Sequence, residues 1–113
     1  MAVTQEQIKQ ELAKGKQYIV ALLKKGKKFI TDEAQAEAMR GKHFDHLFQL
    51  RAEGKVIVLF GTRENGEVRS IEVFVSSDKS EVERLVSEDP AVQAGHFSFE
   101  LLQMTGLPGD AVK

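Results

Sequence analysis

The chain has 113 residues, of which 42% are hydrophobic and 29% are charged, a composition typical of one globular domain. Its 16 Lys and Arg nearly balance its 17 Asp and Glu, so the net charge does not favour nucleic acid as a partner. The absence of Cys excludes disulfides, a thiolate nucleophile and a zinc ribbon. The sequence shows no signal-peptide core and no apolar run of roughly 18 residues. We therefore expect a cytoplasmic protein with no membrane partner.

The first predicted element is a short helix outside the core. Thr4 and Gln7 have the spacing of a capping box, in which each side chain bonds the backbone of the other residue. Only Ile8 and Leu12 share an apolar face, so we expect this helix to be peripheral or to dock on a partner. We treat residues 1–16 as an N-terminal helical extension.

A strand and a long helical stretch follow. Residues 17–23 are apolar and rich in β-formers, which predicts the first strand. Thr31 or Asp32 then caps a helix. Gly41 is expected to interrupt this helix, and the helical period resumes until Gly54.

Three more strands and one helix complete the predicted core. The strands are expected at residues 55–61, 67–75 and 96–104, and the helix lies between its cap at Asp78 and Pro90. Residues 55–61 are almost entirely apolar, which indicates burial on both faces. In the next strand, Ser70 and Glu72 lie on the face opposite Ile71 and Val73.

The order of the core elements, β-α-β-β-α-β, is the signature of a ferredoxin-like α+β fold. We expect a four-stranded antiparallel sheet within residues 17–104, with both core helices on one face. The other face needs cover, and a second subunit would supply it. We therefore expect a homodimer, in which one self-complementary face serves both chains. We expect residues 105–113 to form a loose C-terminal tail.

Two polar residues occupy apolar positions on the predicted helices. At about 100° per residue, Leu47 falls near ~40° and Leu50 near ~340° from His43, which puts His43 on the inward face. Asp89 follows Val82 by seven residues, which returns it to within about 20° of the same direction. We expect Asp89 at the C-terminus of its helix, where the helix dipole disfavours an anion. Because both helices pack on one sheet face, the two side chains are able to meet.

Contact between His43 and Asp89 would create a specific chemistry. The carboxylate would accept a hydrogen bond from one ring nitrogen and raise the proton affinity of the imidazole. The other nitrogen would then act as a general acid or base on a small substrate. The alternative is a structural pair that locks two helices together, sealed from any cavity by Phe44, Leu47 and Val86.

These residues belong to a set of motifs that resembles a known family. The motifs are Arg40-x-x-His43, the helix end Glu53-Gly54, the strand closed by Gly61, and the block Asp89-Pro90-Ala91-Val92-Gln93-Ala94-Gly95. The spacing of eleven residues from His43 to Gly54 also matches without a gap. Together they resemble the YCII-related domain from Gln17 to Met104.

The resemblance implies a dimeric α+β-barrel with a ferredoxin-like protomer. It maps the family's histidine and aspartate, which are thought to form an active-site dyad in a cleft, onto His43 and Asp89. Some relatives act on small lactones, among them a chloromuconolactone dehalogenase, which implies a lyase, dehalogenase or isomerase. The chain departs from the family at Gly61-Thr62, where Gly-Pro is usual, and in its extra N-terminal helix.

Two sets of cations have alternative interpretations. Arg40 lies about one turn before His43 and would either bind a substrate carboxylate or form a salt bridge with Glu37 or Glu33. The lysines within residues 24–28 would either bind an anion or form a solvated turn. The net charge favours the turn, and we expect no nucleic-acid partner.

The sequence gives little support for a metal site or for a nucleophilic serine. His43 and His46 are spaced to share a metal ion, but Asp45 points about 200° away on the helix, and no third ligand has a telling spacing. Ser77 lacks the context of a hydrolase nucleophile, and Tyr18 is best explained as a core residue. We therefore expect no metal and no cofactor.

The leading hypothesis is a homodimeric YCII-like protein in which His43 and Asp89 act as an acid/base dyad on a small organic substrate, with Arg40 as a substrate-binding residue. The rival is a non-catalytic module that binds a small ligand or another protein, in which the same pair is structural.

Overall fold

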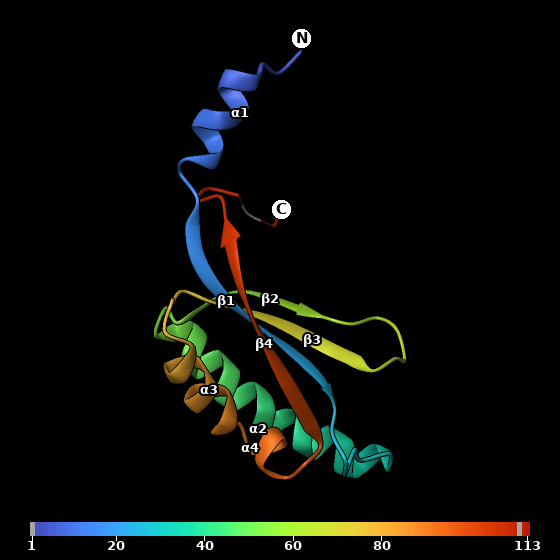
Figure 1. The fold of residues 1–113 in the computed structure, drawn as a ribbon. Coiled ribbons are helices and arrows are strands. Elements are labelled where there is room, and N and C mark those ends of the chain that lie inside the picture. Colours follow the sequence, from blue (N-terminus) through green and yellow to red (C-terminus); the bar gives the residue numbers. More distant parts are fainter. Residues whose placement is uncertain (1, 111) are drawn as a thin grey trace.

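The computed structural model describes residues 2–110 and 112–113 and shows the expected order of core elements, preceded by one extra helix (Figure 1). The strands are β1 (Lys16–Lys25), β2 (Val56–Gly61), β3 (Val68–Phe74) and β4 (Phe97–Gly106). The helices are α1 (Gln5–Leu12), α2 (Glu33–Ala52), α3 (Lys79–Ser87) and α4 (Pro90–Gln93). The short helix α4 lies between α3 and β4 and was not among the predicted elements.

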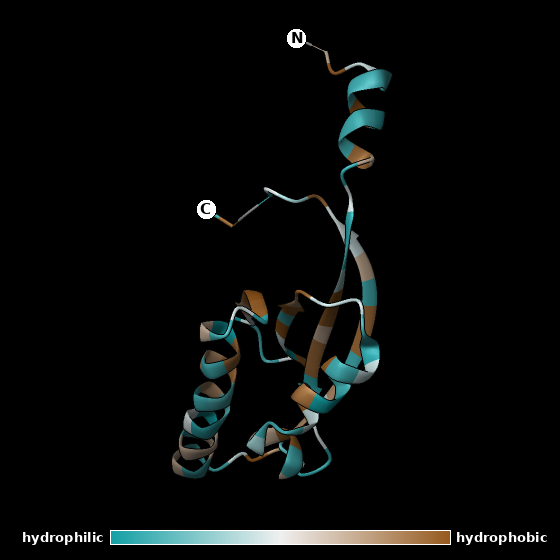
Figure 2. Ribbon diagram, turned by 90° about the vertical axis from the view of Figure 1, so that its left-hand side faces the viewer, coloured by the Kyte–Doolittle hydropathy of each residue, from teal (hydrophilic) through white to brown (hydrophobic). Residues whose placement is uncertain are grey.

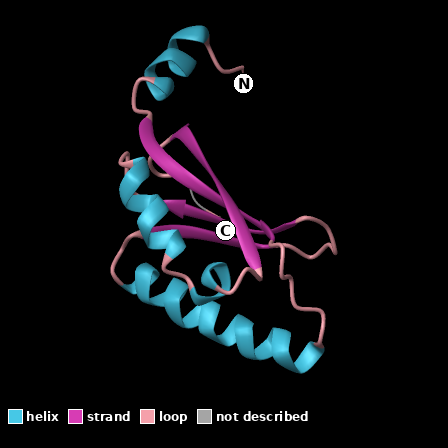
Figure 3. Cartoon of the chain, turned by 60° about the horizontal axis from the view of Figure 1, so that its bottom comes forward, coloured by secondary structure: helices cyan, strands magenta, loops and turns pink. Residues whose placement is uncertain are grey.

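One antiparallel sheet, with the strand order β2-β3-β1-β4, organises the chain. Strand β3 lies between β1 and β2, which is the split β-α-β arrangement of the ferredoxin-like α+β fold and confirms that prediction. Helices α2, α3 and α4 lie on one side of the sheet (Figure 3). The core between them contains the fully buried side chains Ile19, Leu23, Leu47, Val56, Phe74, Val82 and Val86.

Helix α2 is continuous over Glu33–Ala52, so the interruption expected at Gly41 does not occur. A glycine inside a helix costs about 1 kcal/mol relative to alanine. Gly41 lies on the exposed side of α2, whereas His43, Leu47 and Leu50 are buried. The packing of this buried face outweighs the local preference and carries the helix through Gly41.

Strand β2 is an edge strand, and the expectation that it is buried on both faces was wrong. It pairs with β3 alone, and Val56 is the one buried residue among its six described residues. Ile57 and Phe60 are 46% and 48% exposed. The unbroken apolar run instead reflects a sheet with two apolar faces, of which the helices cover one.

The sheet face that points away from the helices is largely apolar and open, and Glu100 opposite Leu22 is a charged residue on it. Its cross-strand pairs include Val20–Val73, Leu22–Ile71, Val58–Val73, Phe60–Ile71 and Val20–Leu102. All of these side chains are partly or largely exposed in the single chain. Ser70 and Glu72 point the other way and are buried beneath the helices. The buried face of β3 is therefore its more polar face.

Helix α1 lies outside the core, as expected. Its capping box is formed, because the Gln7 N–H donates to Thr4 Oγ1 at 3.1 Å and the Thr4 N–H donates to Gln7 Oε1 at 2.8 Å. None of its residues is buried, and most are hydrophilic (Figure 2). The paired ends of β1 and β4 carry α1 away from the body, which gives the molecule dimensions of 53 × 29 × 23 Å. No helix in the described part of the chain is long and apolar enough to cross a membrane.

Candidate active site

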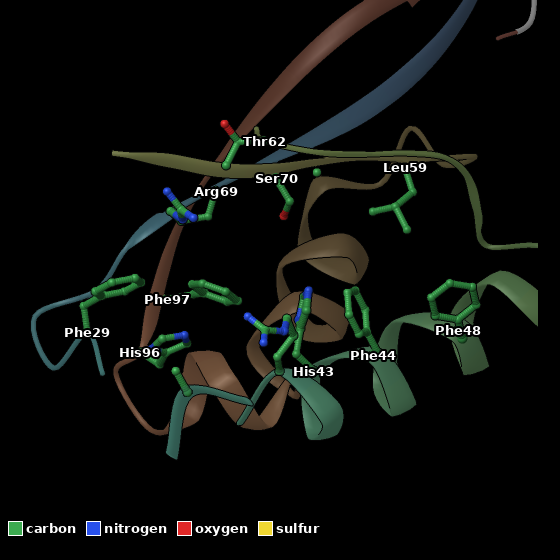
Figure 4. A pocket seen from close by; sticks show the side chains of 13 residues that line it. Phe29, His43, Phe44, Phe48, Leu59, Thr62, Arg69, Ser70, His96 and Phe97 are labelled. Atoms are coloured by element: carbon green, nitrogen blue, oxygen red, sulfur yellow. The ribbon is translucent and has the colours of Figure 1, made fainter. Parts of the chain in front are cut away.

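A cavity of about 730 Å³ lies between α2 and the sheet (Figure 4). Its apolar lining consists of Phe29, Ala36, Phe44, Phe48, Leu59 and Phe97. Its polar lining consists of Arg40, His43, Thr62, Arg69, Ser70 and His96. A space of this size, with apolar walls and a few convergent polar groups, is typical of a site for a small organic molecule.

His43 and Asp89 are in direct contact at the back of this cavity. The distance from His43 Nδ1 to Asp89 Oδ2 is 2.5 Å. His43 is 4% exposed and Asp89 is 2% exposed, so the pair is held away from bulk water. His43 comes from the buried stripe of α2, as the helical wheel predicts.

The position of Asp89 differs from the prediction. Helix α3 ends at Ser87, and Asp89 is the N-cap of α4 rather than the last residue of the preceding helix. Its Oδ1 accepts a hydrogen bond of 2.9 Å from the Ala91 N–H, while Oδ2 contacts His43. Pro90 suits the first position of α4 because its fixed φ fits a helix and its missing N–H is not needed there. The carboxylate is thus stabilised by two donors instead of opposed by a helix dipole.

The second ring nitrogen of His43, Nε2, is left for a ligand. Within residues 2–110 and 112–113 no protein group bonds Nε2, and the ring lines the cavity. Phe97 contacts the ring edge-on with a centroid distance of 5.1 Å, and Phe44 lies at 5.5 Å. The imidazole is therefore fixed by its hydrogen bond on one side and by aromatic packing around it. Such an arrangement presents one nitrogen in a constant direction, as general acid–base chemistry requires.

Glu72, which the sequence analysis did not single out as a site residue, lies beside this pair. It is 3% exposed, and each of the side chains of His43, Glu72 and Asp89 has a nitrogen or oxygen atom within 4.8 Å of the others. Burial raises the pKa of Glu72 to about 7, and the Asp89 carboxylate adds to this while His43 opposes it. Glu72 Oε2 and Ser70 Oγ are buried without a hydrogen-bond partner in the described chain.

His96 is a second histidine of the cavity that the sequence analysis missed. Its Nδ1 accepts a hydrogen bond of 2.9 Å from the Ile30 N–H, so the neutral ring carries its proton on Nε2. The ring stacks on Phe29 at 4.6 Å. Burial lowers the pKa of His96, and His43 lowers it further. His96 is therefore a neutral donor in the cavity wall.

The location of His96 depends on a close approach of two glycines. A Cβ on Gly26 would lie 2.1 Å from the Gly95 carbonyl oxygen, so only glycine fits there. Gly95 has φ 79°, a backbone conformation that favours glycine. The Gly26 N–H donates to the His96 carbonyl at 2.8 Å. These contacts fix the start of β4 against the end of β1.

Two arginines complete the polar lining. Arg40, expected to bind substrate, lines the cavity, and in the described chain it forms neither of the two salt bridges considered for it, with Glu33 or Glu37. Arg69 Nη1 donates to the carbonyl oxygens of Glu64 and Gly66 at 3.1 Å each, which orients the guanidinium. The cavity thus offers positive charge for an anionic group.

The residues considered for a metal do not converge. His46 Nε2 donates to the Leu85 carbonyl at 2.8 Å, a hydrogen bond that links α2 to α3. This nitrogen of His46 is therefore not free to share a metal ion with His43. His43 instead lies with Glu72 and Asp89, and the ligand atoms of these three side chains are within 4.8 Å of one another. In the lysine cluster of residues 24–28, Lys24 forms a salt bridge with Glu100 at 3.3 Å. Lys24 thus connects β1 to β4.

Comparison with known proteins shows a likeness to solved structures. No family model matches the chain, and no curated protein matches it. Among solved structures, the chain is similar to 5-chloro-2-hydroxyhydroquinone dehydrochlorinase (TftG) from Burkholderia phenoliruptrix, determined in complex with 2,5-dihydroxybenzoquinone. The TM-score is 0.55 and the identity 20%, and the match covers 77% of this chain and 91% of the dehydrochlorinase. At this identity the likeness shows a shared fold, and membership of the YCII-related family stays a prediction.

Proposed function

We propose that this protein is a small-molecule enzyme in which His43, held by Asp89, moves a proton on a ligand bound in the cavity. The observation that carries the proposal is that His43, one member of the buried pair, borders an open space of about 730 Å³. Phe44, expected to seal a purely structural pair, instead lines the cavity and is 42% exposed. Leu47 and Val86 are buried in the core. This arrangement supports the catalytic interpretation over the structural one.

The proton would move at His43 Nε2. In this proposal the Nδ1–H of the neutral ring donates a hydrogen bond to the Asp89 carboxylate and keeps its proton. The other ring nitrogen, Nε2, accepts a proton from the substrate. The Asp89 carboxylate then stabilises the imidazolium that forms, as a buried carboxylate does beside a catalytic histidine. Return of the proton to a different carbon of the substrate would complete an isomerisation. In an elimination, the electron pair of the broken C–H bond would form a double bond, the leaving group would depart as an anion with the electron pair of its own bond, and the imidazolium would pass its proton to that anion or to water.

The other polar lining residues have complementary roles in this proposal. His96 would donate its Nε2 hydrogen to a substrate oxygen on which negative charge develops. Arg40 would bind a carboxylate or another anionic oxygen of the substrate, because no ion pair or hydrogen bond in the described chain engages its guanidinium, whereas Arg69 donates to two backbone carbonyls. The aromatic walls would hold the apolar body of the ligand.

Two likenesses support a reaction of the lyase, dehalogenase or isomerase type. The similar solved structure is of a dehydrochlorinase bound to a small ring compound. The motifs around His43 and Asp89 resemble the YCII-related family, for which such an active-site dyad is thought to exist. Both are analogies of fold and motif, so the substrate must come from experiment.

We also propose that the protein is a cytoplasmic homodimer. The support for the homodimer is the open apolar sheet face, whose members include Val20, Leu22, Ile71, Val73 and Leu102. Apolar faces of this kind are commonly covered by another protein surface. A second copy of the chain would cover it with a matching face.

The test uses small organic acids and lactones in D₂O. Ligands that bind are found by NMR, and solvent deuterium incorporation or turnover is then followed in the ligand spectrum. The wild type is expected to exchange or convert at least one bound ligand, and His43→Gln and Asp89→Asn are expected to lose this activity. Asp45→Asn, an exposed substitution on the solvated side of α2, is the matched control. Binding with no exchange in the wild type would favour the non-catalytic module.

A further inference from the structure

Glu72 is the buried titratable group for which the proposed mechanism has no use. Glu72 does not line the cavity, but its carboxylate lies within 4.8 Å of a side-chain nitrogen of His43, which does line it. Its partners in the sheet are Ala21 on β1 and Leu59 on β2, both apolar. The titratable groups that face it are His43 from α2 and Asp89 from the start of α4. No Lys or Arg neutralises this carboxyl group in the described chain.

The charges of the three groups limit the protonation states that the site can adopt. Two carboxylates and one neutral histidine would place two uncompensated negative charges in a dry environment, which is costly. One additional proton lowers this to a single negative charge. That proton resides either on Glu72, with His43 neutral, or on His43, with Glu72 ionised. Both arrangements have the same net charge, so exchange between them does not change the total charge of the buried site.

We propose that Glu72 is a positioning residue for the dyad, and that it shares one exchangeable proton with His43 at neutral pH. While Glu72 holds this proton, His43 is a neutral base. When Glu72 is ionised, its negative charge holds His43 as the imidazolium, which is the acid form. This inference rests on the proposed function, because it assigns to Glu72 the control of the protonation state that acid–base chemistry at His43 needs.

Three observations support this assignment. Glu72 Oε2 has no hydrogen-bond partner among the described residues, so nothing but a proton or a nearby cation compensates it. The pKa of this carboxyl is raised to about 7, which places its proton exchange in the range where a histidine also titrates. His43 and Asp89 act on the Glu72 pKa in opposite directions, because a protonated imidazole stabilises the Glu72 carboxylate and the Asp89 carboxylate destabilises it.

The inference is tested by an NMR pH titration of the wild type, labelled with ¹³C at the glutamate carboxyl carbons and at the histidine rings. The Glu72 carboxyl signal is expected to titrate with a midpoint near 7, and the His43 ring signals should report the same event. In Glu72→Gln, this shared step should disappear from the His43 curve. The His43 midpoint should also move to lower pH, because the anion that favours imidazolium is gone. Glu100→Gln, which removes an exposed carboxyl from β4, should leave the His43 curve unchanged.

Three results would overturn the inference. One is a His43 curve in Glu72→Gln that superimposes on that of the wild type. Another is a wild-type Glu72 signal that titrates near its ordinary value of 4.5, which needs no variant and therefore stands even if Glu72→Gln does not fold. Stoichiometric shifts of both the His43 and Glu72 signals on addition of Zn²⁺ alone would likewise show a cation in place of the shared proton. The loss of ligand exchange in Asp89→Asn, measured in metal-free buffer, does not depend on any of these results, so failure here is distinguishable from failure of the proposed function.

Discussion

His43 on α2 and Asp89 at the start of α4 are 46 residues apart in the sequence, and their side chains meet at 2.5 Å in the interior of the protein. Asp89 has two tasks at this point. One carboxylate oxygen caps α4 through the Ala91 N–H, and the other fixes the His43 ring. The local structure of the chain and the geometry of the candidate site thus depend on the same side chain.

Because Asp89 both caps α4 and bonds His43, we predict that its replacement lowers the stability of the fold more than the loss of a helix cap alone. Asp89→Ala should lower the free energy of unfolding by about 3 kcal/mol, because it removes a cap and leaves a buried histidine without its partner. Asp78→Ala is the matched control, since Asp78 caps α3 through the N–H groups of Ser80 and Glu81 and is exposed. It should cost about 1 kcal/mol. Urea unfolding of both variants measures the difference, and equal losses would show that the His43 contact contributes nothing.

Glu72 predicts a pH-dependent stability. Its pKa rises from 4.5 to about 7 on folding, so the folded chain holds this proton more tightly than the unfolded chain does. The resulting stability is fully present below pH 4.5 and is lost as the pH rises to about 7. The loss from this one group should be about 3 kcal/mol.

Comparison of wild type and Glu72→Gln between pH 5 and pH 8 isolates this contribution. Urea unfolding should show the wild type losing stability relative to the variant as the pH rises through the interval. Parallel stability curves for the two proteins would mean that Glu72 is ionised without penalty in the folded chain.

Arg40 predicts a charge-dependent ligand affinity. Replacement of Arg40 by Ala should weaken binding of an anionic ligand found in the NMR screen by about tenfold or more, since a hydrogen bond to a charged group contributes about 1.5–3 kcal/mol. Arg84→Ala, which removes an exposed arginine of α3 outside the cavity, is the control and should bind as the wild type does. Isothermal calorimetry measures both. Unchanged affinity in Arg40→Ala would remove this residue from the site.

The open sheet face predicts the assembly. Light scattering should give a mass twice the 12.6 kDa of the chain. Val73→Lys, in the centre of the open face, should shift the protein to monomer because it places a charge in an apolar interface. Leu12→Lys on α1 makes the same chemical change away from the sheet and should leave the dimer intact. A monomeric wild type would refute the homodimer.

The sequence was most informative where periodicity and capping act locally. The element order, the Thr4 capping box and the inward direction of His43 all follow from spacing. The helix break predicted at Gly41 was wrong because the packing of α2 decides whether the helix is continuous, and that packing is a property of the whole fold. The prediction that β2 is buried on both faces was wrong because an apolar run does not distinguish a central strand from an edge strand with one open face.

The candidate site shows the same division. The block from Asp89 to Gly95 drew attention to Asp89, but its role as an N-cap depended on where α3 ends. Glu72 and His96 were missed because each lies on a strand pattern that fits a solvated residue equally well. Only the sheet register, which places Glu72 between Ala21 and Leu59 beneath α2, shows that it is buried.

The decisive measurement is an NMR pH titration of the His43 ring in the wild type and in Asp89→Asn. A coupled acid–base pair predicts that the His43 midpoint moves to lower pH in Asp89→Asn, because the carboxylate that stabilises the imidazolium is replaced by a neutral amide of similar shape. Asp45→Asn on the outer side of α2 should leave the midpoint unchanged. Identical His43 titrations in the wild type and in Asp89→Asn would contradict the dyad and leave a non-catalytic binding module as the better description.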